Sequence, residues 1–470
     1  MREMASAWAW DGRRSSQRRG FRTGAFTLAV FLLFGVLPAP YAVEAGAVAE
    51  PRRISLSEAI EIALKQNSSV LRAENETAMN RAAVSDATMR FLPDLQLGLS
   101  GSKSYAQSGT ESGTSFGAGL SSSVVLFDGL ARVAELRAAR LEEAAGVKDL
   151  ERSRQTVVFQ VITGYLAMIE ATEQVRVQEE NLAAQQEQEE SVRALVEEGQ
   201  RPISELYQQE SNVAAAQLSS VEGRRTLELS RVDLVQVLQL DPTGVYDFEI
   251  PPVPEIDADA SEPDLSALLE RAARTRPDAA AVADRSVAAG EQVRSAKAEY
   301  WPALSLSADY GTGYSGTADG AFFDQLDLRR SGSVGLSVSV PLFDRFAARN
   351  GVRRAQISRN NAKLAESDVE QEVALQVRRA VLDWNTAHER LRAADARARA
   401  SRQALDSTNE RYAAGAATLY EVTLSRSDFV AAESGLVSAR YNLLWQGRLL
   451  DYYVGDLDPA DGLGEARSKL

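Results

Sequence analysis

The chain has 470 residues and a formal net charge of -14, with 66 acidic side chains against 52 basic ones. Such an acidic chain does not suit the phosphate backbone of nucleic acids, so we expect no nucleic-acid partner. It contains no cysteine, which excludes disulfides, thiol catalysis, cysteine metal ligands and a lipid anchor on an N-terminal cysteine.

The first 49 residues have the features of an export signal. Several arginines precede an apolar stretch from Ala25 to Leu37, and small residues follow as far as Ala49. This stretch is shorter than the roughly 20 residues that a membrane-spanning helix needs. We therefore predict a signal peptide over residues 1–49 in preference to a retained anchor. No later stretch is long and apolar enough for a helical span.

A first repeat is predicted over residues 50–240. Helical periodicity runs to Phe91, and Pro93 ends it because proline cannot continue a helix. Two segments of alternating apolar and polar residues follow, separated by a loop rich in Gly, Ser and Thr. A long proline-free helical pattern comes next, and after a turn at Gly199 a second helix must run antiparallel to it. The predicted strands are about 95–105 and 115–126, and the predicted long helices about 129–197 and 202–240.

A linker is predicted over residues 241–263, where several prolines and acidic residues prevent a helix. The second repeat, over residues 264–456, has the same order of short helices, strands and long helices, with its turn at Gly415. We expect residues 457–470 to form a polar C-terminal tail. The predicted strands are about 303–313 and 332–342, and the predicted long helices about 345–413 and 418–455.

The two halves carry the same landmarks in the same order. Pro93 and Pro302 precede the first strand of each half, and the letters LFD at 126–128 return at 342–344. Such self-similarity indicates a protomer built by duplication. We expect its two halves to occupy equivalent places in a ring.

The four strands have the length and pattern of membrane strands. About ten residues suffice for a tilted strand to cross a bilayer, and each strand has one apolar face and one face of Ser, Gly and Asp. A soluble β-sandwich would also alternate and is the alternative. Four strands cannot close a water-filled barrel, so chains must share one, and three copies would supply twelve strands. Aromatic residues at the helix side of the strands are predicted to lie at the membrane interface, namely Phe91, Phe127, Trp301 and Phe343.

These landmarks together resemble the TolC-like outer-membrane efflux proteins over about residues 54–456. The resemblance implies an α+β membrane protein, internally duplicated, that forms a homotrimer. Its 12-stranded barrel would lie in the outer membrane of a Gram-negative-type envelope, and its long α-helical coiled-coil barrel in the periplasm. The implied partners are a periplasmic adaptor and an inner-membrane transporter of the RND, ABC or MFS type. The implied function is a passive exit duct of a tripartite efflux pump or type I secretion system.

The resemblance also implies a constriction at the periplasmic tip, where the turns between long helices meet. Glu205 and Glu421 each follow the turn glycine of their repeat by six residues. In a trimer they would place carboxylates near one axis and concentrate cations, although two glutamates on solvated helix faces are the alternative. Family members commonly have a basic residue after the second turn as part of a polar lock. Here Ala417 stands at that turn and Arg201 at the first, while Tyr412 fits the family pattern.

Other candidate sites have simpler interpretations. Gly199 and Gly415 are predicted first as helix C-caps, and second as the turns where an adaptor docks. The one histidine, His388, lies among charged residues of a long helix and is predicted to be a surface residue. We predict no catalytic residue, metal or cofactor, because the acidic residues do not cluster with a histidine, cysteine or nucleophile. A periplasmic coiled-coil adaptor acting as a scaffold is the alternative function, and an adhesin with coiled-coil stalks is a third.

Overall fold

A computed structural model of the chain describes residues 52–105, 113–251 and 262–457. The predicted signal peptide lies outside these ranges, as do residues 458–470 of the predicted tail. The first repeat contains α1 (Leu56–Gln66), α2 (Ser68–Met89), β2 (Gln96–Lys103), β3 (Thr114–Phe127), α3 (Ala131–Glu197) and α4 (Ile203–Leu238). The second contains α5 (Leu265–Thr275), α6 (Pro277–Ala298), β5 (Ala303–Ser315), α7 (Phe322–Leu328), β6 (Ser331–Ser339), α8 (Ala347–Ala413) and α9 (Leu419–Val454).

Corresponding helices of the two repeats have equal lengths. Helices α3 and α8 both have 67 residues, and α4 and α9 both have 36. The shorter pairs match as well, with 11 residues in α1 and α5 and 22 in α2 and α6. From the start of α3 to the end of α4, every residue has its counterpart 216 positions later, since Ala131 corresponds to Ala347 and Ile203 to Leu419. For α1 and α2 the shift is 209, from Leu56 to Leu265.

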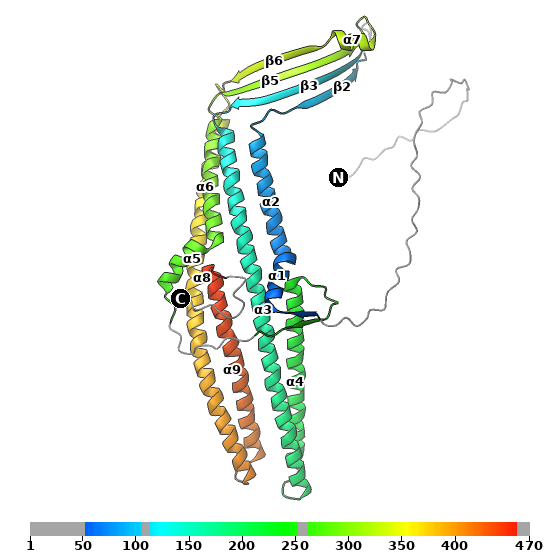
Figure 1. The fold of residues 1–470 in the computed structure, drawn as a ribbon. Helices are drawn as coiled ribbons and strands as arrows, with labels where there is room; N and C mark the ends of the chain where they lie inside the picture. Colours follow the sequence, from blue (N-terminus) through cyan, green and yellow to red (C-terminus); the bar gives the residue numbers. More distant parts are fainter. Residues whose placement is uncertain (1–51, 106–112, 252–261, 458–470) are drawn as a thin grey trace, which may run out of the picture. The chain divides into compact units, whose positions relative to one another are not determined.

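The four long strands form one antiparallel sheet in the order β2-β3-β5-β6 (Figure 1). Leu97 and Tyr310 both lie opposite Leu120, and Leu336 lies opposite Leu306. Directly opposed residues share a face, so these apolar side chains lie on one side of the sheet. The register confirms the predicted alternation, because the other face is polar or small. That face carries Gln96, Ser100, Ser121, Ser305 and Asp309.

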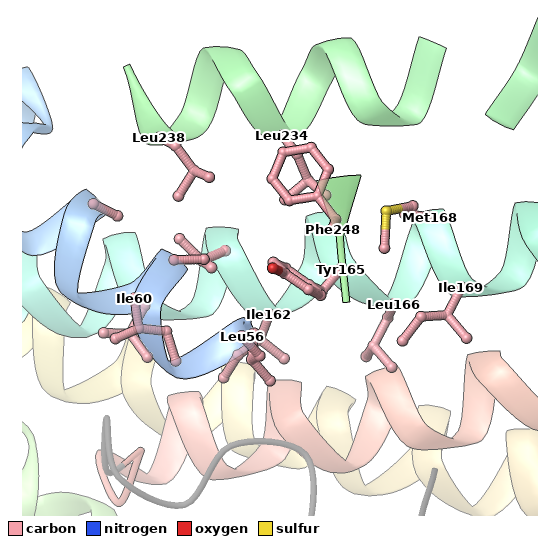
Figure 2. Close-up of a cluster of buried hydrophobic side chains, with 14 of the residues drawn as sticks. Leu56, Ile60, Ile162, Tyr165, Leu166, Met168, Ile169, Leu234, Leu238 and Phe248 are labelled. Atoms are coloured by element: carbon pink, nitrogen blue, oxygen red, sulfur yellow. The ribbon is translucent and has the colours of Figure 1, made fainter. Parts of the chain in front are cut away.

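The main buried core joins the first repeat to α9. Figure 2 shows Tyr165 of α3 among side chains from α1, α4 and β4 (Tyr246–Phe248). Its hydroxyl donates to the carbonyl oxygen of Ile54 at 2.9 Å, and its ring meets Phe248 edge-on with centroids 5.9 Å apart. Burial raises the pKa of the Tyr165 hydroxyl well above its ordinary value. None of the described helices has a segment long and apolar enough to cross a membrane.

Buried ions tie the second repeat to the first. Asp278, in the first turn of α6, accepts a hydrogen bond from Arg276 Nε at 3.0 Å and lies 3.7 Å from Arg152 Nε of α3. Arg276 also donates to Gln376 Oε1 at 2.7 Å, and Arg152 stacks on the ring of Tyr452 at 3.9 Å. Burial opposes ionisation of Asp278, but the two arginines outweigh it and hold its pKa below the ordinary 3.8.

Three elements differ from the sequence prediction. The predicted linker over 241–263 contains β4, which pairs in parallel with β1 (Arg52–Ile54). Strand β6 ends at Ser339, short of the predicted 342, because Pro341 has no N–H to donate to a ladder. Helix α7 occupies part of the loop between the third and fourth strands, where the Phe322 ring packs on Phe116 and Tyr314. Segments of three to seven residues are too short to show a period.

The prediction that His388 lies on the surface is wrong. Its imidazole is buried and stacks on Trp384 with ring centroids 5.2 Å apart. The two residues are four apart, so they lie one above the other on the same face of α8. The charged residues beside His388 in sequence occupy the other faces of the helix. The apolar stripe that contains Ala380, Trp384, Ala387 and Leu391 was the signal that the prediction overlooked.

The Asp278→Asn variant is expected to lose about 3 kcal/mol of stability, because two arginines then remain buried without their anion. A lowered melting temperature in detergent would show it. The matched control is Asp395→Asn, which removes an exposed ion pair with Arg399 and should change stability by less than about 1 kcal/mol. The stabilisation should also fade below pH of about 4, since Asp278 must protonate there. Equal melting of both variants at pH 7 would contradict the role of Asp278.

Candidate functional site

Both long hairpins turn on a glycine in the left-handed region. Gly199 follows α3 with φ of 75°, and Gly415 follows α8 with φ of 73°. At each turn the next residue donates back across the helix end: Gln200 N to Leu195 O at 2.8 Å and Ala416 N to Arg411 O at 2.7 Å. This bond satisfies a helix carbonyl that otherwise has no partner, and glycine adopts the required backbone without strain. The C-cap prediction for both glycines is therefore confirmed.

The helices after the two turns begin differently. Helix α9 starts with a capping box, in which the Thr418 hydroxyl accepts from Glu421 N at 3.3 Å and the Glu421 carboxylate accepts from Thr418 N at 2.9 Å. Pro202 stands at the equivalent position before α4. Proline has neither a hydroxyl nor an N–H, so Glu205 has no capping box to join. The motif of Thr418 and Glu421 was visible in the sequence but not recognised there.

Glu205 instead connects the two hairpins. Its Oε2 accepts a hydrogen bond from the Tyr412 hydroxyl at 3.1 Å, and its Oε1 lies 3.6 Å from Arg201 Nη1. The Arg201 guanidinium stacks over the Tyr412 ring at 4.6 Å and donates to the Tyr412 carbonyl oxygen at 3.4 Å. Three of the predicted site residues thus form one cluster, which we call the tip triad. Glu421 is not part of it.

Apolar packing surrounds the tip triad. Tyr412 is buried with Val192 of α3 and with Leu419 and Val422 of α9, and Leu206 of α4 packs against them. Burial, followed by the charge of Glu205, raises the pKa of the Tyr412 hydroxyl above its ordinary 10. Tyr412 therefore keeps its proton at neutral pH and serves as a hydrogen-bond donor. The arrangement can hold the two hairpin ends together by a polar contact inside an apolar cluster.

The four predicted interfacial aromatics, Phe91, Phe127, Trp301 and Phe343, all have exposed side chains. They lie where the strands meet the helices. There the Arg132 guanidinium stacks on the Phe91 ring at 5.0 Å and donates to the Arg90 carbonyl oxygen at 2.9 Å. The described residues include no group of three or more His, Asp or Glu side chains placed to hold a metal ion.

The duplicated hairpins and the sheet match a known family. The family model "Outer membrane efflux protein" matches residues 59–238 and 268–455. The chain belongs to this family. Both matched ranges correspond to one repeat each, and between them they contain the tip triad and all four long strands.

Several known proteins are similar to this member of the family. The outer membrane efflux protein BepC of Brucella suis is 23% identical over 354 residues, which cover 74% of this chain and 73% of BepC. The pyoverdine export outer membrane protein OpmQ of Pseudomonas putida is 30% identical over 276 residues, 55% of this chain and 57% of OpmQ. The crystal structure of the outer membrane protein VceC from Vibrio cholerae aligns with a TM-score of 0.74 at 19% identity, covering 85% of this chain and 96% of VceC. The fold is that of outer-membrane channels, which confirms the predicted α+β class.

The Tyr412→Phe variant should loosen the hairpin ends. It removes the hydrogen bond to Glu205, worth about 1.5 kcal/mol for a charged acceptor, and leaves the ring packing intact. Backbone amides at the tip should then exchange with deuterium about tenfold faster. The control is Tyr420→Phe, where the side chain is exposed. The same exchange rate in both variants would argue against the tip triad as a clamp.

Proposed function

We propose that the protein is a homotrimeric exit duct in the outer membrane, which conducts substrates passively from a periplasmic pump assembly to the exterior. Three copies would supply twelve strands for a barrel, and their long helices would continue it as a periplasmic tube. The lipid would meet the apolar face of the sheet, and water the face of Ser, Gly and Asp. Phe91, Phe127, Trp301 and Phe343 would then lie at the membrane interface.

The amphipathic four-stranded sheet is the observation that carries this proposal. Its apolar face includes side chains such as Leu97, Leu99, Leu336 and Val338, all of which are exposed. Its two edges, β2 and β6, each pair on one side only within the described chain. Exposed strand edges and a broad apolar face are both unfavourable in water, and a lipid-embedded shared barrel removes both penalties. A periplasmic adaptor, the alternative, would explain the hairpins but not this sheet.

The partners we propose are a periplasmic adaptor and an inner-membrane transporter of the RND, ABC or MFS type. The turns at Gly199 and Gly415 are the proposed docking points, because they form the ends of both hairpins. A passive duct has no energy source of its own, so the transporter would supply it.

The tip triad is proposed as the closed-state clamp of the duct. It joins the two hairpins of one protomer, so docking of the adaptor would open the tip by separating Tyr412 from Glu205. Glu421 would act differently, because its carboxylate is held by its own helix start. We propose that Glu205 and Glu421 together still make the tip electronegative and favour cations.

Planar-bilayer recording on detergent-purified protein tests the duct. We expect discrete channels that conduct cations better than anions, and at least about a twofold loss of that preference in the Glu205→Gln/Glu421→Gln variant. Glutamine can still serve in a capping box, so the Glu421→Gln change leaves the start of α9 intact.

Absence of any channel activity would contradict the duct. Unchanged selectivity in the double variant would remove the electronegative tip but leave the duct standing. The matched control is Glu389→Gln, an exposed carboxylate on α8 far in sequence from the turn, which should leave selectivity unchanged.

A further inference from the structure

The two repeats have the same residues at equivalent positions but very different exposure. Leu166 of α3 is 2% exposed, whereas its counterpart Leu382 of α8 is 58% exposed. Val437 of α9 is 8% exposed, and its counterpart Val221 of α4 is 58% exposed. The same pair of side chains is therefore covered in one place and uncovered in the other. A difference of this size at matched positions indicates a missing neighbour.

The covered pair lies where the first repeat packs on the second. Leu166 and Val437 belong to one buried cluster, and Figure 2 shows Leu166 pointing toward the reddish helix α9. In this contact α3 packs against α6 and α9. The equivalent contact would place α8 against α2 and α4. Within the described chain α8 makes no comparable contact with either helix.

We propose that a second copy of the chain fills this place, with α8 of one protomer packing on α2 and α4 of the next in the register that α3 keeps on α6 and α9. The inference rests on the proposed trimer and gives its interface residue by residue. Leu382 of one copy would pack on Val221 of the next. The two surfaces are different, so each contact leaves both ends free for further copies, and a closed ring satisfies all of them.

Charged residues support the same register. Within the chain, Gln174 Nε2 donates to Ser438 Oγ at 3.2 Å across the contact between α3 and α9. Shifted by 216 residues, these positions are Arg390 and Glu222, two exposed side chains of opposite charge. A neutral hydrogen bond inside the protomer thus corresponds to an ion pair between protomers. Opposite charges facing each other fix the register and disfavour slipped alternatives.

The sheet gives an independent check. Strand β3 pairs with β5 so that Ser122 lies opposite Ala308 and Val124 opposite Leu306. Shifting β3 by 216 and β5 by 209 predicts pairing of β6 with β2 of the next copy. Val338 then lies opposite Leu99, and Val340 opposite Leu97. Apolar residues meet on the apolar face, although this pairing was not used to choose the register.

Disulfide trapping tests the register directly, because the chain has no cysteine of its own. In the Leu382→Cys/Val221→Cys variant, an added oxidant should convert most of the chain into a covalent trimer on non-reducing gels. The control Leu382→Cys/Val232→Cys should remain monomeric. Val232 is equally exposed, at 60%, and lies on nearly the same face of α4, but about 16 Å farther along the helix. Leu166→Cys/Val437→Cys should cross-link within one chain and run as a monomer.

Native mass spectrometry of the uncross-linked protein separates the two proposals. If the protein is trimeric and the Val221 pair fails while the Val232 pair links, or if neither links, the register is wrong and the duct stands. If the protein is not trimeric, both the duct and the register fall.

Charge reversal gives a second test that needs no cysteine. Arg390→Glu and Glu222→Arg should each lower the temperature at which the detergent-solubilised trimer dissociates, and the double variant should recover most of that loss. Arg399→Glu reverses an exposed charge elsewhere on α8 and should have little effect. Additive losses in the double variant would overturn the proposed pair.

Discussion

The pairing of backbone groups at the sheet edges is the constraint on which the rest of the structure depends. Strands β2 and β6 leave one side of their ladders open in the described chain. In lipid an unpaired backbone group costs several kcal/mol, and within one chain the order β2-β3-β5-β6 cannot supply the missing partners. The duplication turns this deficit into a rule of assembly. Since β3 of the first repeat pairs with β5 of the second, the equivalent β6 can pair with β2 of another copy. The helices below follow the same rule, because α3 packs on α9 as α8 would pack on the next α4.

Equivalence between the repeats ends at the tip, and one residue accounts for much of the difference. Thr418 gives α9 a capping box that holds the Glu421 carboxylate. Pro202, its counterpart, offers no such partner, so Glu205 is available to Arg201 and Tyr412. A local difference in helix capping is therefore converted into a contact between hairpins. In the proposed duct, this places the clamp on one carboxylate of the repeat pair and leaves the other in a structural role.

Sequence periodicity predicted the long elements well, because strands with a period of two and helices of dozens of residues repeat their signal many times. It failed where the signal is short or lies in another part of the chain. β4 has three residues, and its partner β1 is nearly two hundred residues away in sequence. His388 was misplaced because its sequence neighbours, not its helix face, were considered. Glu205 and Glu421 looked equivalent by spacing, and only the contacts of Pro202 and Thr418 distinguish them. The cluster of Arg201 with Tyr412 joins residues 211 positions apart, which spacing alone cannot bring together.

The central claim is that two equivalent halves per chain build one closed ring of three chains. Cryo-electron microscopy of the detergent-purified protein tests it most directly, without any variant. The account predicts particles with threefold symmetry, twelve strands in one closed barrel, and α3 and α8 alternating around the axis in nearly equivalent environments. A monomer with an open sheet, or a ring in which α8 meets the next copy through surfaces other than α2 and α4, would contradict it.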